Sequence, residues 1–276
     1  MLAMPMSATY LRVLKLEDLA AAVGLSSVAG WNQTAEDWRM LMNLAPDSCF
    51  GIEVGGQLVS TTTLICYGRS LAWIGMVLTK PEHRGRGYAR RLVAHALEYA
   101  DALGIATVKL DATDQGHRLY EDLGFHDEQP IERWSRAGAS ATTVAPDPSH
   151  VTAYAELDRN ASGADRSRML ERLAARSQVY TESDAYLLTR AGRVATYLGP
   201  CAASDPEAAC ALITKVVNAM PGSGWSWDLL PKNQDALALA SALGFNPQRQ
   251  LTRMARGKVL QGRDDMVYAI AGFELG

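Results

Sequence analysis

The chain has 276 residues, which corresponds to about two domains at roughly 150 residues each. Hydrophobic residues make up 48% and charged residues 21%, so a disordered or fibrous protein is excluded. Because 27 Lys and Arg face 30 Asp and Glu, the net charge of −3 provides no general attraction for nucleic acid or anionic membranes. The four cysteines lack metal-like spacing, and the start MLAMPMSATY lacks a basic signal-peptide region. We therefore expect a cytoplasmic protein with no metal, nucleic-acid or membrane partner.

The first third of the chain alternates between helical and extended patterns. Residues 9–14 predict a short strand, and residues 15–44 predict two helices separated by a loop at Gly30. Three apolar, β-branched runs follow, over residues 49–55, 57–68 and 70–79. Glycine-containing turns separate these runs, which is typical of an antiparallel meander.

The period then changes to that of a helix. Apolar residues recur at positions 89, 92, 93, 96, 97, 100 and 103, which predicts one long amphipathic helix ending at Gly104. Residues 106–113 predict a strand, and a short helix ending at Gly124 and a strand reaching Trp134 follow it.

The second half partly repeats this order. Residues 137–150 are small and Pro-containing, which predicts a linker. Beyond it we expect helices over 151–177, two strands flanking Ala191-Gly192, a helix over 206–220, a strand over 225–230, a helix over 233–243 and further strands. The segments LYEDLGF (119–125) and LASALGF (239–245) occupy matching places, each after a strand that ends near an Asp. This indicates a diverged internal duplication, with domains at 1–136 and 151–276.

One loop carries the clearest chemical signal. The segment MVLTKPEHRGRGYARRL (76–92) places two glycines and several arginines between a strand end and a helix start. Main-chain amides there can point together at an anion, and the helix dipole adds partial positive charge. A solvated basic turn is the alternative explanation of the loop by itself.

The residues RGRGYA (84–89) match the Arg/Gln-x-x-Gly-x-Gly/Ala signature of the GCN5-related N-acetyltransferase (GNAT) family, and the surrounding order of elements matches as well. The chain thus resembles the tandem-domain members of that family. The resemblance implies an α/β (α+β) fold with two tandem GNAT-like domains, each a mixed, mostly antiparallel twisted sheet flanked by helices. The first domain would be catalytic, and the second a degenerate copy.

The resemblance also implies how the donor binds. It assigns the pyrophosphate of acetyl-CoA to the loop residues Arg84, Gly85, Arg86, Gly87, Tyr88 and Ala89. It assigns the pantetheine arm to the strand edge at Val77, Leu78 and Thr79, where the fourth and fifth strands splay apart. The chemistry is direct attack of an amine on the thioester, so acetyl-CoA is the only cofactor required and no metal is needed.

The resemblance also suggests which residues transfer protons. Tyr120 matches the family's general acid for the departing thiolate, and a core tyrosine is the alternative. Many relatives place a Glu on the fourth strand as the base, but residues 73–76 contain no carboxylate. Glu53, Asp111 and His83 are the nearest titratable candidates, although a solvated strand residue, a turn cap and an exposed loop residue explain them equally well. An acceptor amine of low pKa, or ordered water, would remove the need for a base.

The acceptor pocket is expected to be built by the loop between the first two helices and by the third and fourth strands, with the second domain as a further contributor. Trp31, Asn32, Tyr67 and Trp73 are the candidate lining residues, and closure of an interdomain core is the alternative for these aromatic rings.

The second half lacks donor machinery, because Ala240 stands opposite Tyr120 and residues 199–210 contain no phosphate loop. We expect it to complete the acceptor site or to cover apolar surface. Trp225 and Trp227 share one strand face and fit an interface as well as a binding role. Polar residues near the start of this half fit helix capping better than ligand binding: Asp158, Asn160, Asp165 and Arg166.

These observations predict an acetyl-CoA-dependent N-acetyltransferase, an acyltransferase that acts on a small-molecule amine as a monomer or homodimer. Two alternatives stay open. One is an acetyltransferase for a protein or peptide amine, and the other is a non-catalytic acyl-CoA-binding sensor. Tyr120 favours catalysis, whereas the missing strand carboxylate favours the sensor.

Overall fold

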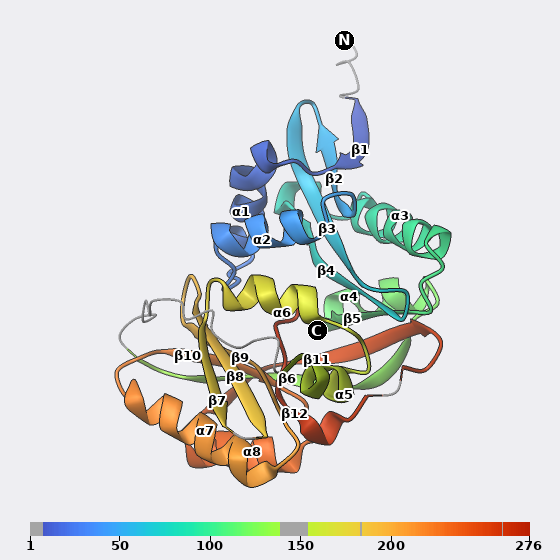
Figure 1. The fold of residues 1–276 in the computed structure, drawn as a ribbon. Coiled ribbons are helices and arrows are strands. Elements are labelled where there is room, and N and C mark those ends of the chain that lie inside the picture. Colours follow the sequence, from blue (N-terminus) through green and yellow to red (C-terminus); the bar gives the residue numbers. More distant parts are fainter. Residues whose placement is uncertain (1–7, 139–153, 183, 261) are drawn as a thin grey trace.

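The computed structural model describes residues 8–138, 154–182, 184–260 and 262–276, so most of the predicted linker lies outside the described residues. The first half has the order predicted from its sequence (Figure 1). Its α-helices and strands are β1 (Thr9–Val13), α1 (Leu19–Val28), α2 (Ala35–Leu44), β2 (Cys49–Val54), β3 (Gln57–Tyr67), β4 (Leu71–Thr79), α3 (Tyr88–Ala102), β5 (Thr107–Ala112), α4 (Asp114–Glu121) and β6 (His126–Arg136). Short 3-10 helices are η1 (Leu16–Asp18) and η2 (Pro81–His83).

The second half repeats the helix and strand pattern in shortened form. Its elements are α5 (Ala155–Ser162), α6 (Ser167–Ala174), β7 (Gln178–Glu182), β8 (Ala185–Ala191), β9 (Thr196–Ala203), α7 (Pro206–Ala219), β10 (Trp225–Leu229), α8 (Gln234–Ala242), β11 (Asn246–Gly257), η4 (Asp264–Met266) and β12 (Val267–Ala269). Strand β7 was not predicted, because its residues QVYTE do not alternate between apolar and polar.

All strands belong to one continuous mixed sheet, in the order β1-β2-β3-β4-β5-β11-β6-β10-β9-β8-β7, with β12 beside β9. The predicted mixed α/β fold is confirmed, but each half does not build a separate sheet. Strand β11 of the second half lies between β5 and β6 of the first, and β6 lies between β11 and β10 (Figure 1). The two halves therefore exchange one strand each.

Two buried ion pairs mark this exchange. Arg253 on β11 donates to both carboxylate oxygens of Asp111 on β5, at 2.9 and 3.2 Å. Arg133 on β6 donates to both oxygens of Asp228 on β10, at 2.6 Å each. Both aspartates are the strand-end residues of the duplicated pattern, so each half supplies one Asp and one Arg to a reciprocal pair.

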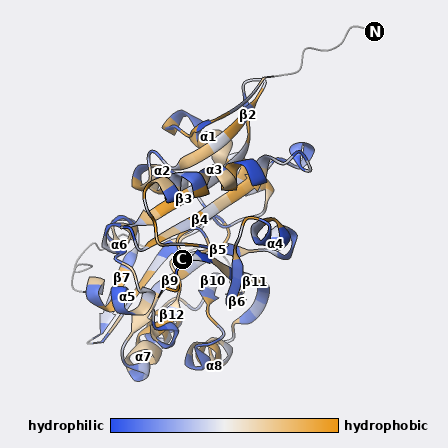
Figure 2. Ribbon diagram, turned by 90° about the vertical axis from the view of Figure 1, so that its right-hand side faces the viewer, coloured by the Kyte–Doolittle hydropathy of each residue, from blue (hydrophilic) through white to orange (hydrophobic). Residues whose placement is uncertain are grey.

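Apolar side chains fill the space on both faces of the sheet. Helix α3 packs on β3 and β4 with its predicted apolar stripe, and α7 and α8 cover strands of the second half. A further core joins Trp38 and Leu41 of α2 to Leu170 and Leu173 of α6, so the halves also share apolar packing. In Figure 2 the strands β3 and β4 are largely hydrophobic, whereas α4 is hydrophilic.

Candidate active site

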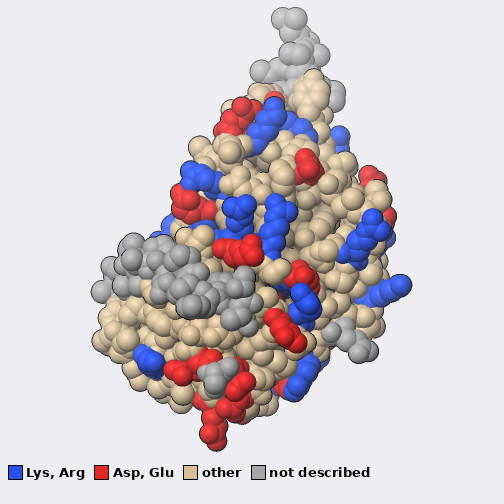
Figure 3. Space-filling view, viewed as in Figure 1, with Lys and Arg blue, Asp and Glu red and all other residues tan. Residues whose placement is uncertain are grey.

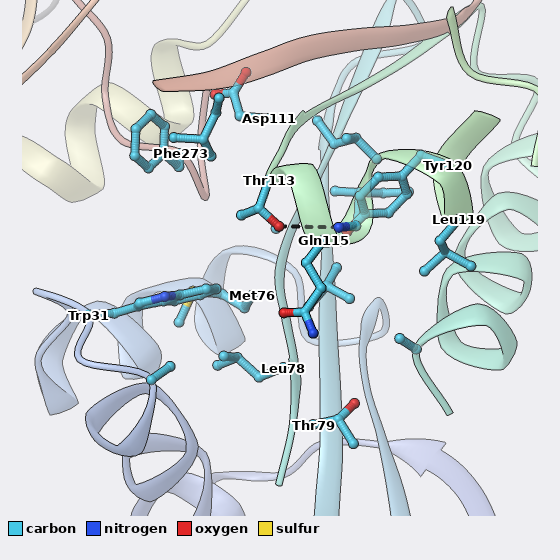
Figure 4. Close-up of a pocket in the computed structure, with 18 of the residues that line it drawn as sticks. Trp31, Met76, Leu78, Thr79, Asp111, Thr113, Gln115, Leu119, Tyr120 and Phe273 are labelled. Atoms are coloured by element: carbon cyan, nitrogen blue, oxygen red, sulfur yellow. Dashed lines mark hydrogen bonds between the residues drawn. The ribbon is translucent and has the colours of Figure 1, made fainter. Parts of the chain in front are cut away.

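A cavity of about 810 Å³ opens where β4 and β5 separate. The two strands pair in parallel only over residues 71–73 and 107–109, and then diverge. Side chains from β4, α4 and both halves face this space (Figure 4). Main-chain groups of β4 beyond Trp73 are therefore not paired with β5, which leaves a strand edge facing the cavity.

A bulge in β4 lies at the start of this edge. The register with β3 shifts between the pairs Thr61–Leu78 and Thr63–Gly75, and Met76 has a φ of 51°. Such a value is unusual for a residue with a side chain, and neighbouring contacts must hold it. The hydroxyl of Thr61 donates to the Met76 carbonyl at 2.9 Å and thereby fixes the bulge.

The basic loop follows β4 and lines the cavity beyond Thr79, which Figure 4 shows well apart from Phe273 of the second half. Gly85 and Gly87 have φ values of 74° and 77°, in the left-handed region that favours glycine. Gly87 is the N-cap of α3 and supplies no side-chain cap, so the first amides of this helix are open to an anion. The predicted donor residues on this cavity are Val77, Leu78, Thr79, Arg84, Gly85, Gly87, Tyr88 and Ala89. Arg86 is not among them, because its guanidinium donates to the Glu82 carbonyl at 3.0 Å.

Tyr120 lies on α4 and lines the same cavity (Figure 4). Its ring is 8% exposed, it packs edge-on against Phe125, and its hydroxyl makes no hydrogen bond to a described residue. Burial raises the pKa of Tyr120 to about 12, so the phenol stays protonated near neutral pH. Thr113 caps α4 by accepting from the Gly116 amide at 3.2 Å, and Gly116 leaves room for the tyrosine ring.

Of the four predicted acceptor residues, the structure brings only Trp31 to this cavity. Asn32 binds the loop between β8 and β9 instead, through the Ala195 carbonyl and the amides of residues 194 and 195. Tyr67 is buried and donates to the Leu275 carbonyl at 2.6 Å. Trp73 donates to the Phe273 carbonyl at 2.9 Å and lies under the Arg253 guanidinium. These three residues do not line this cavity, because Asn32 is bound by the β8–β9 loop, and Tyr67 and Trp73 are bound by residues 271–276.

The three candidate bases occupy different environments. Glu53 pairs with Arg12 at 3.0 Å on β2, away from the cavity residues. Asp111 lines the cavity, but both of its oxygens accept from Arg253, and burial raises its pKa. His83 lines the cavity beside the basic loop, and its buried Nδ1 has no hydrogen-bond partner among the described residues.

Several cavity residues were missed by the sequence analysis. They come from the α1–α2 connection, from β6 and from the second half: Gln33, Arg133, Arg249, Gln250, Leu251, Phe273 and Glu274. The strand exchange brings the second-half residues there, and no local motif signals such a long-range placement.

The other candidates in the second half have structural partners. Trp225 and Trp227 are fully buried in the core beneath α7 and α8. Asp165 caps α6 by accepting from the Ser167 amide at 3.1 Å, as expected. Asp158 and Arg166 instead form a buried bidentate ion pair, so capping was the wrong expectation for them.

Charged side chains of both signs are interspersed on the face shown in Figure 3. Large uncharged areas separate them, and Asp and Glu side chains gather at the lower end of this view. Within the described ranges, no group of three or more His, Cys, Asp or Glu residues is placed to hold a metal ion. The same part of the chain contains no helix of the length and apolarity that a membrane crossing requires.

The splayed parallel strands, the bulge and the open helix start are the architecture of an acyltransferase of the GNAT type. Residues 16–125 match the Acetyltransferase (GNAT) family and residues 154–269 match an Acetyltransferase (GNAT) domain, which together span most of the chain. The chain belongs to the GCN5-related N-acetyltransferase family and is an N-acetyltransferase with two GNAT domains in tandem.

Relatives agree with this assignment over both halves. The uncharacterized N-acetyltransferase YitH of Bacillus subtilis is 27% identical over 222 residues, which cover 75% of this chain and 77% of YitH. A putative acetyltransferase from Pyrococcus horikoshii has the same fold, with a TM-score of 0.86, 21% identity and coverage of 99% and 98% of the two chains. A tandem GNAT protein from the clavulanic acid biosynthesis pathway matches with a TM-score of 0.59 and 16% identity, over 91% and 98% of the two chains.

Proposed function

We propose that the cavity between β4 and α4 binds acetyl-CoA and transfers its acetyl group to the amine of a small molecule. The observation that carries this proposal is the shared lining of one cavity by the basic loop, the free edge of β4, Tyr120 and residues of the second half. A cavity of about 810 Å³ lies within the range of ligand sites, roughly 300–1,000 Å³.

The donor would lie along β4. Amides at the start of α3, together with Arg84, would bind the pyrophosphate, and the edge at Val77, Leu78 and Thr79 would pair with the pantetheine amides. This places the thioester near the Met76 bulge and Tyr120, which line the same cavity. The phenol would then protonate the CoA thiolate as the C–S bond breaks.

The acceptor would lie at the end formed with the second half. Arg249 lines this end, is half-buried, and makes no ion pair or hydrogen bond with a described residue. Burial and the nearby Arg133 lower the pKa of Arg249, so an anion beside it would be stabilising. We therefore infer an amine that also carries an anionic group, as an amino acid does.

The second half would complete this acceptor end and would not bind CoA itself. Ala240, which replaces a tyrosine in the repeat, is fully buried in the core. We take residues 1–136 as the catalytic domain, 137–150 as the linker and 151–276 as the supporting domain.

The four cysteines are free thiols, which agrees with the reducing interior of a cell.

The test is release of CoA thiol from acetyl-CoA with a panel of amines. The panel should pair each amino acid with its amide and its decarboxylated amine, and should include peptides. We expect turnover with a small carboxylated amine, and loss of CoA binding in the Arg84→Ala/Gly87→Ala variant. That variant should keep the fold and be about 1 kcal/mol less stable, because alanine is strained at the left-handed φ of Gly87. CoA binding without thiol release for every amine would contradict the proposal, and wild-type CoA affinity in the variant would contradict the loop assignment.

A further inference from the structure

Strand β4 carries no carboxylate, but a segment of the second half that contains Glu274 packs against it. Residues 271–276 lie against β4 at Gly75. A Cβ atom added to Gly75 would lie 2.8 Å from Cα and 2.9 Å from the carbonyl oxygen of Glu274. The absence of a side chain at Gly75 thus allows the main chain of Glu274 to approach the strand directly.

Side chains from both halves fix this segment. Trp73 and Tyr67 of the first half bind the carbonyls of Phe273 and Leu275. Arg166 of the second half, held by Asp158, binds the main-chain oxygen of Gly276. The same contacts that keep Trp73 and Tyr67 out of the cavity therefore position Glu274.

Glu274 lines the cavity and is 4% exposed. Its Oε2 accepts from Gln33 Nε2 at 2.8 Å, and Gln33 lines the cavity beside Trp31. Its Oε1 lies 3.7 Å from Arg190 Nη2, whose own hydrogen bonds go to main-chain carbonyls.

The charged groups around Glu274 have opposite effects on its pKa. Arg190 and Arg133 favour its ionised form, whereas Asp37 disfavours it. Burial has the largest effect and raises the pKa of Glu274. A carboxylate with a raised pKa and without a bidentate Arg partner retains affinity for a proton.

We propose that Glu274 is the general base of the acetyl transfer, supplied to the first half by the segment that follows β12. This inference rests on the proposed function. The acceptor arrives as an ammonium ion, and Glu274 takes one proton to give the free amine. The amine nitrogen forms a C–N bond to the acetyl carbon, and the C–S bond breaks. Tyr120 protonates the sulfur and regains a proton from the nitrogen, while Glu274 passes its proton to solvent.

Glu274 fits this role better than the other carboxylate and imidazole on the cavity. Both oxygens of Asp111 accept hydrogen bonds from Arg253, so neither oxygen is directed at an acceptor amine in the cavity. His83 follows the end of β4 and adjoins the basic loop, at the donor end of the site. Glu274 is hydrogen-bonded to Gln33, and both line the cavity with Trp31 and Phe273, which belong to the proposed acceptor end.

The experiment compares Glu274→Gln with wild type on two acceptors, an alkyl amine that is protonated at the assay pH and a hydroxylamine or hydrazine that is mostly not. For the alkyl amine we expect kcat/KM to fall by about 10²- to 10⁴-fold, with loss of the acidic limb of the pH profile. For the low-pKa acceptor the loss should be far smaller, because no proton must be removed first. CoA affinity should not change. Glu274→Asp keeps the carboxylate and should recover part of the alkyl-amine activity.

Glu128→Gln is the matched control, since Glu128 is a half-buried carboxylate paired with Lys109 and does not line the cavity. It should leave both activities at the wild-type level. If Glu274→Gln loses activity equally with both acceptors, or loses none, Glu274 is not the general base. Turnover by the wild-type protein would still support the proposed function in that case. No wild-type turnover with any amine would overturn the proposed function, and the base with it.

Discussion

Replacement of Gly75 by alanine tests the contact between β4 and residues 271–276 with a single methyl group. Gly75 is not among the positive-φ glycines, so alanine brings no backbone strain of its own. The new Cβ would lie 2.8 Å from the Glu274 Cα and 2.9 Å from its carbonyl oxygen. The effect of this substitution therefore comes from the contact itself.

The size of the effect follows from ordinary contact distances. Non-bonded carbon atoms are most stable about 3.5–4.0 Å apart, so the Glu274 main chain must move by roughly 0.7–1.2 Å. Overpacking of this kind lowers the free energy of unfolding by about 1–3 kcal/mol. A catalytic group displaced by about 1 Å loses about 10²-fold in rate. We expect both changes in Gly75→Ala, with CoA affinity retained.

Urea unfolding and steady-state thiol release measure these two quantities, and CoA titration provides the third. Gly24→Ala is the matched control, because Gly24 lies in α1 and a Cβ there meets no atom within 4 Å. That variant should be more stable by about 0.5–1 kcal/mol and fully active. Wild-type stability and turnover in Gly75→Ala would refute the contact, and lost stability with unchanged kcat would refute its importance for the reaction.

Two further predictions concern Tyr120 and the reciprocal ion pairs. Tyr120→Phe should keep CoA affinity and lower kcat by about 10²- to 10⁴-fold, and unchanged turnover would reject the acid role. Because the pKa of Tyr120 is raised to about 12, its stabilising effect is complete below pH 10 and is lost as the pH rises toward 12, so alkaline unfolding of Tyr120→Phe should begin at higher pH. Asp228→Asn leaves the Arg133 charge without its carboxylate and should lower the free energy of unfolding by about 3–5 kcal/mol. Asp228 also accepts from the Tyr197 hydroxyl at 2.7 Å, so the apolar variant Asp228→Leu/Arg133→Met/Tyr197→Phe should recover most of this loss in urea unfolding. Equal losses in the two variants would contradict the pairing.

Local patterns predicted most of the elements, because their periods are strong and their ends carry clear signals. The stripe of α3 and its glycine start, the meander β2–β4 and the repeated LGF segments each lie where expected. The order of the strands in the sheet was not predictable in this way. Pairing of β11 with β5 depends on residues more than a hundred positions apart, and neither strand carries a sign of its partner.

The candidate site likewise has one part that local sequence predicts and one part that depends on long-range contacts. The donor side consists of one continuous stretch around 76–89 and of Tyr120, so motif and spacing were sufficient to nominate it. The acceptor side is assembled from Trp31 and from second-half residues such as Arg249 and Glu274. An aromatic pocket was expected from Tyr67 and Trp73, but both rings instead bind the carbonyls of the segment that brings Glu274. The Tyr67 hydroxyl and the Trp73 indole N–H donate hydrogen bonds to this segment, and this accounts for the two aromatic residues at these positions.

The strand exchange has a consequence for synthesis on the ribosome. When residue 136 has emerged, β6 has no partner yet, since both of its neighbours, β11 and β10, belong to the second half. Roughly ten seconds of translation separate β6 from the completion of β11. During that interval the nascent chain exposes unpaired strand edges of a kind that promote association with other chains. A chaperone that shields β5 and β6 would therefore be expected to raise the yield of native protein. A chain truncated before residue 257 would lack part of β11 and could not complete the sheet between β5 and β6.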